Sequence, residues 1–116
     1  MPERFEAIRR RILAFRDERD WHQFHSPKDL AEAIAIEAAE LLELFLWKDG
    51  EHSRTAVSEA TDRVSEEVAD ILIFLVYLCE EAGISLLDAV EHKLRVNDSK
   101  YPAERSRGRS DKYKEP

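Results

Sequence analysis

Residues 34–46 read IAIEAAELLELFL, and residues 64–79 read VSEEVADILIFLVYLC. In both segments apolar residues recur at spacings of three and four, which predicts two helices that each bury one face. We call the row of residues at these spacings a seam. The two seams are Leu30, Ile34, Glu37, Leu41 and Leu44, and Ala60, Val64, Glu67, Ile71, Phe74 and Leu78. A single carboxylate therefore interrupts each apolar row at its centre.

The rest of the chain predicts two further helices and no strand. One covers about residues 2–20, and a short connector follows at 21–25. Ser26 is then the expected N-cap of the first seam helix, and Pro27 is its first residue. The first seam helix then runs to about Lys48, a polar loop follows, and the second seam helix covers about 57–82, ended by Gly83. The last helix follows Ser85 and ends near Lys100, before Pro102. We expect an all-α, four-helix domain over residues 1–102 and a basic tail over 103–116.

Length and composition narrow the class of protein. A chain of 116 residues supports one domain. The single cysteine, Cys79, excludes a disulfide framework, and the charged start lacks the apolar centre of a signal peptide. The longest apolar run, 71–79, is too short to cross a bilayer. The net charge of −7 argues against binding a nucleic acid polymer. We expect a soluble, cytoplasmic protein.

Both seam helices are apolar on more than one face. Ile36, Leu42 and Leu46 lie off the first seam, and Leu72 and Leu75 lie off the second. A helix that is apolar all round must be buried on all sides, and a lone four-helix unit leaves each helix one face in water. The pattern therefore predicts a homo-oligomer, in which a second copy covers these faces.

The acids of the seams predict a metal site. Three residues after Glu37 and Glu67 stand Glu40 and Asp70, so each helix presents a carboxylate pair on one face. Burying such groups is costly unless cations, protons or metal ions compensate, and the seams offer no Lys or Arg at facing positions. Oxygen donors without histidine or cysteine suit Mg²⁺, with Mn²⁺ as a substitute. A di-iron bundle is excluded, because no histidine stands three residues after a glutamate.

Other residues allow a functional and a purely structural interpretation. Lys93, Asn97 and Lys100 share one helix face beside Tyr101, either as phosphate donors or as a solvated helix end favoured by the helix dipole. Trp21 and Trp47 flank the first seam helix and suit either base stacking or packing. His25 suits either a base-edge contact or a loop hydrogen bond.

Taken in order, these motifs resemble a known family. The segment DWHQFHSP at 20–27, IEAAEL at 36–41 and FLWK at 45–48 are similar to the dCTP pyrophosphatase branch of the MazG-like superfamily. EEVADILI at 66–73 resembles that superfamily's second metal motif. The pair Lys93 and Asn97, with KYP at 100–102, resembles its phosphate-side motif. RSDKY at 109–113 is similar to the end of those enzymes.

The resemblance implies a four-helix protomer that forms a homodimer or homotetramer, and Mg²⁺ held by Glu37, Glu40, Glu67 and Asp70. It implies hydrolysis of a nucleoside triphosphate, dCTP or a modified dCTP, between the α- and β-phosphates. It also implies a base pocket that includes Trp21, His25 and Trp47. Phe74 stands where some relatives carry tyrosine, and the loop 48–57 is shorter than in animal members.

The catalytic step and the substrate stay open at this point. One of the glutamates, with Glu40 as the candidate, accepts or orients a proton as water attacks the α-phosphorus. A non-catalytic nucleotide sensor on the same scaffold is an alternative. So is the same chemistry on dUTP, phosphoribosyl-ATP or a damaged nucleotide.

Overall fold

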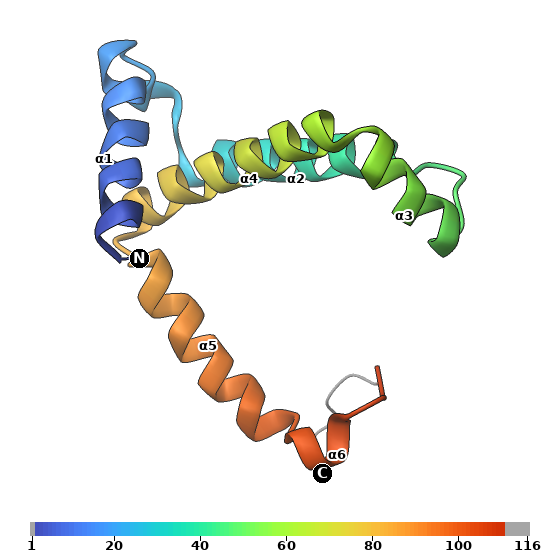
Figure 1. The fold of residues 1–116 in the computed structure, drawn as a ribbon. Helices are drawn as coiled ribbons and strands as arrows, with labels where there is room; N and C mark the ends of the chain where they lie inside the picture. The colour runs from blue at the N-terminus through green and yellow to red at the C-terminus, as the bar shows by residue number, and fades with distance from the viewer. Residues whose placement is uncertain (1, 111–116) are drawn as a thin grey trace. The chain divides into compact units, whose positions relative to one another are not determined.

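The computed structural model describes residues 2–110, and in that range it contains helices and no strand (Figure 1). The helices are α1 (Pro2–Glu18), the short 3₁₀ helix η1 (His22–Phe24), α2 (Pro27–Glu43), α3 (Gly50–Glu59), α4 (Thr61–Ala82), α5 (Leu86–Lys100) and α6 (Ala103–Ser106). The all-α class is confirmed, and the four long helices that the sequence predicts are α1, α2, α4 and α5. Part of the predicted tail, 111–116, lies outside the described residues.

The chain divides into two units, one ending at Gly83 and the other beginning at Ile84. In the first unit α2 and α4 run side by side, while α1 and α3 each contact α4 (Figure 1). Arg9 of α1 pairs with Glu80 of α4 at 3.0 Å, and His22 pairs with Glu81. The second unit consists of α5 and α6.

Caps set most of the helix boundaries. The Ser26 hydroxyl accepts a hydrogen bond from the Asp29 amide at 3.1 Å, and the Ser85 hydroxyl accepts one from the Asp88 amide at 3.4 Å. Gly83 ends α4 in the left-handed conformation, with φ 67°, which glycine adopts without steric cost. These three predicted boundaries are confirmed.

The segment between the seam helices differs from the prediction. Helix α2 ends at Glu43, well before Lys48, and residues 50–59 form α3 where the sequence predicts a polar loop. The reason is Asp49, which caps a new helix by accepting a hydrogen bond from the His52 amide at 2.8 Å. The second seam helix accordingly begins at Thr61, after a break at Ala60 (φ −125°, ψ 35°).

The core of the described residues is small. Leu30, Ala56, Val76 and Tyr77 are its buried apolar residues. Many large apolar side chains stay exposed, among them Ile36, Leu42, Val68 and Leu72 on α2 and α4. This exposure agrees with the prediction that both helices are apolar on more than one face, which the single chain cannot bury. No helix within residues 2–110 combines the length and apolar character that crossing a bilayer requires.

Candidate active site

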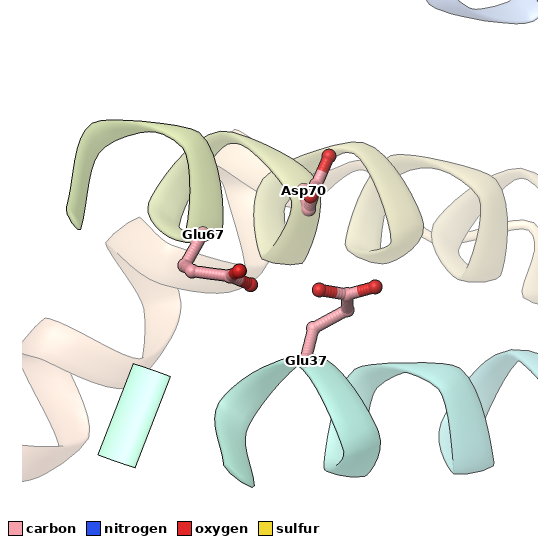
Figure 2. Close-up of side chains that lie close together, drawn as sticks. All are labelled: Glu37, Glu67 and Asp70. Atoms are coloured by element: carbon pink, nitrogen blue, oxygen red, sulfur yellow. The ribbon is translucent and has the colours of Figure 1, made fainter. Parts of the chain in front are cut away.

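The two seam helices bring three acids to one point. Because α2 and α4 pack along one another, Glu37 of α2 faces Glu67 and Asp70 of α4 (Figure 2). One carboxylate oxygen from each of the three lies within 4.8 Å of the other two. Oxygens gathered this closely match the donor set that a hard divalent cation takes from proteins.

The cluster concentrates negative charge without a cation to balance it. Within residues 2–110, no salt bridge involves Glu37, Glu40, Glu67 or Asp70. The Oε2 atoms of Glu37 and Glu67 are buried and accept no hydrogen bond from a donor among the described side chains and backbone. Buried acceptors of this kind call for a proton or a metal ion.

The electrostatics of Glu37 reflect the crowding. Its pKa is raised from 4.5 to about 7, first because Glu67 shares a hydrogen bond with the protonated form and then because the group is partly desolvated. A hydrogen bond to Glu40 and the negative charges of Glu40 and Asp70 raise it further. The crowding therefore favours the protonated form of Glu37 well above the pH at which an ordinary glutamate ionises.

Glu40 lies beside the cluster and does not belong to it. It acts on Glu37 by hydrogen bond and charge, yet its side chain is exposed and it is absent from the group of three converging ligand oxygens. The structure thus separates the four predicted acids into three that converge and one at their edge.

A pocket of about 770 Å³ adjoins the acids, and Asp70 belongs to its wall. Its other walls come from α1, from the connector before α2 and from α4. The aromatic lining consists of Phe15, Trp21, Phe74 and Tyr77, with His25 beside them. A mostly apolar cavity of this size, with a few polar groups, is typical of small-molecule sites.

The remaining predicted residues lie in two other places. Trp47 stands in the turn after α2 with φ 65° and is 95% exposed, and it is not part of the pocket wall. Lys93, Asn97 and Lys100 lie on α5, and Tyr101 caps its end through a 2.7 Å hydrogen bond from its amide to the Asn97 carbonyl. These four residues belong to the second unit, so their part in the site stays a prediction.

Three residues at or near the pocket could not be singled out from the sequence. Arg19 places its guanidinium carbon 3.5 Å from the centroid of the Phe15 ring, and Phe15 makes an edge contact with Trp21 at 5.7 Å. Tyr77 is buried behind His25, with ring centroids 4.7 Å apart. Arg16 is buried on α1. The apolar spacing of α4 includes Tyr77, but no motif distinguishes it from a core aromatic.

The chain is similar to known proteins over most of its length. The sequence matches the model of the MazG-like family over residues 33–115. It is 43% identical over 112 residues to dCTP pyrophosphatase 1 of Homo sapiens and 42% identical over 110 residues to that of Bos taurus. The alignments cover 95% and 93% of the chain but 66% and 65% of these relatives, so the chain spans just under two thirds of their length.

A solved structure of a pyrophosphatase from Archaeoglobus fulgidus has the same fold. It matches with a TM-score of 0.82 and 40% sequence identity, over 85% of this chain and 93% of the other. The likeness therefore extends over most of both chains.

Proposed function

Because the chain belongs to the MazG-like family, we propose that it is a nucleoside triphosphate pyrophosphohydrolase that depends on a divalent cation. The observation that carries the proposal is the cluster of Glu37, Glu67 and Asp70, in which Asp70 also belongs to the wall of an aromatic pocket. The names of the curated relatives support dCTP or a modified dCTP as the substrate. The pyrophosphatase fold of the Archaeoglobus fulgidus protein supports the reaction class.

The residues of the cluster fit Mg²⁺. They offer only carboxylate oxygens, and the buried Oε2 atoms of Glu37 and Glu67 are acceptors that a cation would satisfy. When bound, the cation supplies positive charge to phosphate oxygens and makes a water molecule more acidic. Mn²⁺, which also prefers oxygen ligands, is a substitute.

The side chains divide the remaining work. Glu37, Glu67 and Asp70 hold the cation, and Glu40, exposed beside Glu37, accepts the proton of the attacking water. Water attacks the α-phosphorus, the anhydride bond to the β-phosphate breaks, and monophosphate and pyrophosphate form. Lys93, Asn97, Lys100 and Tyr101 supply donors for the phosphates.

The pocket suits a nucleobase. Trp21 and Phe15 form an edge-to-face pair at its wall, and flat aromatic surfaces stabilise a stacked base by about 1–3 kcal/mol. His25 adds a polar edge next to these apolar walls. Asp70 connects the base pocket to the acids, which is the arrangement a nucleotide needs when its phosphates meet the metal.

The test is a nucleotide panel. The protein, with Mg²⁺, is incubated with ordinary and modified nucleoside triphosphates, and the products are identified by chromatography. We expect monophosphate plus pyrophosphate, fastest from dCTP or its 5-substituted analogues. Diphosphate plus orthophosphate would contradict the proposed bond cleavage. An absence of turnover would favour a nucleotide sensor.

A pair of neighbouring substitutions tests the site itself. Glu67→Gln removes one converging carboxylate and should lower kcat/KM by about 100-fold or more, since losing a metal ligand weakens both binding and charge stabilisation. Glu66→Gln is the matched control, because Glu66 is exposed and outside the cluster. Circular dichroism checks that both variants stay folded. Equal activity in the two variants would remove Glu67 from the site.

A further inference from the structure

Arg16 occupies a position on α1 where the packing pattern calls for an apolar residue. It follows Ile12 by four residues, on the face that contacts α4, and only 6% of it is exposed. Its Nε donates to the Asp17 carboxylate at 2.8 Å. Its Nη1, however, is buried and has no hydrogen-bond partner within residues 2–110. A buried charged donor of this kind is costly and calls for a function.

A second buried nitrogen lies nearby on a different segment. Nδ1 of His25, in the connector before α2, is also buried and also has no hydrogen-bond partner in the described part of the chain. Both residues lie near the same tyrosine. The ring of Tyr77 lies 4.7 Å from the His25 ring and 6.0 Å from the Arg16 guanidinium carbon.

The tyrosine itself is held in place. It is buried, and its hydroxyl donates to the Ile12 carbonyl at 3.4 Å. Arg16 therefore packs behind a fixed ring, while His25 lies at the pocket wall on that ring. Arg16 is not part of the pocket wall, so any influence it has on a ligand passes through His25.

The surroundings of His25 favour one protonation state. Burial lowers the pKa of the imidazole, and the positive charges of Arg16 and His22 lower it further, while Glu81 opposes them. A neutral imidazole carries one N–H and one lone pair. The Arg16 guanidinium packs against the same tyrosine as His25, and its positive charge favours the lone pair at the buried Nδ1, which leaves the hydrogen on Nε2. Because Nδ1 is buried, Nε2 is the nitrogen available to the pocket.

We propose that Arg16 is a positioning residue that fixes the neutral tautomer of His25 with its hydrogen on Nε2, so that the pocket presents a hydrogen-bond donor to the base. The consequence for substrates rests on the proposed function. Cytosine and uracil both carry an acceptor at O2, but at N3 cytosine carries an acceptor and uracil a donor, so the discrimination arises where the donor meets N3. A fixed donor at the wall favours the first base and sets two donors against each other with the second.

Nitrogen NMR tests the tautomer without any turnover. The four histidines of ¹⁵N-labelled full chain are recorded above neutral pH, and His25→Gln assigns the signal. In the wild-type protein, Nδ1 should show the shift of an unprotonated nitrogen and Nε2 that of an N–H. Arg16→Met should mix the tautomers and raise the pKa of His25, and Arg16→Lys should preserve the wild-type pattern. A wild-type hydrogen on Nδ1, or an unchanged Arg16→Met spectrum, overturns the proposal.

The ratio of kcat/KM for dCTP to that for dUTP tests the consequence. Arg16→Met should lower this ratio about three- to tenfold, the range expected for one neutral hydrogen bond. Arg16→Lys should keep it, and so should the control Arg10→Met, because the Arg10 side chain on the same helix is 75% exposed. If Arg16→Met lowered kcat/KM equally for both nucleotides, Arg16 would have only a packing role, and the proposal would be overturned. If the wild-type protein hydrolyses neither nucleotide, the proposed function fails, and the NMR result alone decides the tautomer.

Discussion

At the scale of the residue, Glu37 couples the protonation of the site to folding. Its pKa of about 7 in the folded chain compares with 4.5 for an ordinary glutamate, because Glu67, partial burial, Glu40 and Asp70 all favour the protonated form. Between these two values the folded chain holds a proton that the unfolded chain has released. Stability must therefore fall as the pH rises through that interval. A bound cation reverses the preference, because it requires the ionised carboxylate.

The first prediction concerns pH and metal together. In a chelator, the thermal unfolding midpoint should fall between about pH 5 and pH 8, as Glu37 is forced to ionise without a counterion. Adding Mg²⁺ should raise the midpoint more at the alkaline end than at the acid end. Differential scanning calorimetry across this range measures both effects. Glu37→Gln is the comparison and should show a weaker dependence on pH and little response to Mg²⁺. A metal-induced shift that is the same at every pH would contradict the role of Glu37.

The acids of the site could be predicted from the sequence, but Arg16 and Tyr77 could not. Glu37, Glu67 and Asp70 are predictable because a carboxylate in an apolar row is costly and conspicuous. Arg16 and Tyr77 are not, because an arginine on a helix is usually solvated and a tyrosine in an apolar run is usually core. Trp47 has a left-handed backbone and is 95% exposed, and no nearby residue type predicts either property.

At the scale of the element, the pairing of α2 with α4 determines the site. The pairing can be predicted, since both helices carry matching seams. The break at Ala60 and the helix that begins at Gly50 could not, because Asp49-Gly50 is compatible with either a helix end or a new cap. Ala56 of α3 is buried, and α3 contacts α4. That packing depends on tertiary contacts which a local pattern does not contain.

The second prediction concerns the most deeply buried side chain of α2. Leu30 on α2 is 1% exposed and is the largest fully buried side chain among residues 2–110. Leu30→Ala should destabilise the protein by about 2–5 kcal/mol, since it removes buried surface and leaves a cavity. Urea unfolding followed by circular dichroism measures the change. The control on the same helix is Lys28→Ala, whose exposed ion pair with Glu32 contributes at most about 1 kcal/mol. Comparable losses in both variants would contradict the role of Leu30 in the core.

At the scale of the whole molecule, the single chain leaves much apolar surface in water. Ile36, Leu42, Val68 and Leu72 are exposed on the two helices that hold the site, and Val68 and Leu72 share one face of α4. Exposed apolar side chains on one helix face are typical of a surface that another protein covers. The homo-oligomer stays a prediction, and α2 and α4 are among the helices whose exposed apolar side chains it would cover.

The third prediction is therefore an assembly that depends on α4. Analytical ultracentrifugation of the wild-type protein at micromolar concentration should show a dimer or a tetramer. Val68→Glu should shift the distribution toward smaller species, because a charge in an apolar interface is strongly unfavourable. Ser65→Glu, on an exposed polar position of the same helix, is the control and should leave the distribution unchanged. A folded wild-type monomer at that concentration would rule out the assembly.

The crowded acids also create a conflict between catalytic function and thermal stability. At the pH where the proposed enzyme would act, an ionised Glu37 beside Glu67 and Asp70 destabilises the fold. A neutral amide at residue 37 would remove this destabilisation. Directed evolution that ranked clones by survival after heating, with no nucleotide assay, would thus enrich sequences that had discarded their catalytic capacity. A directed-evolution experiment that aims to stabilise this protein therefore has to measure both heat resistance and nucleotide hydrolysis in every round.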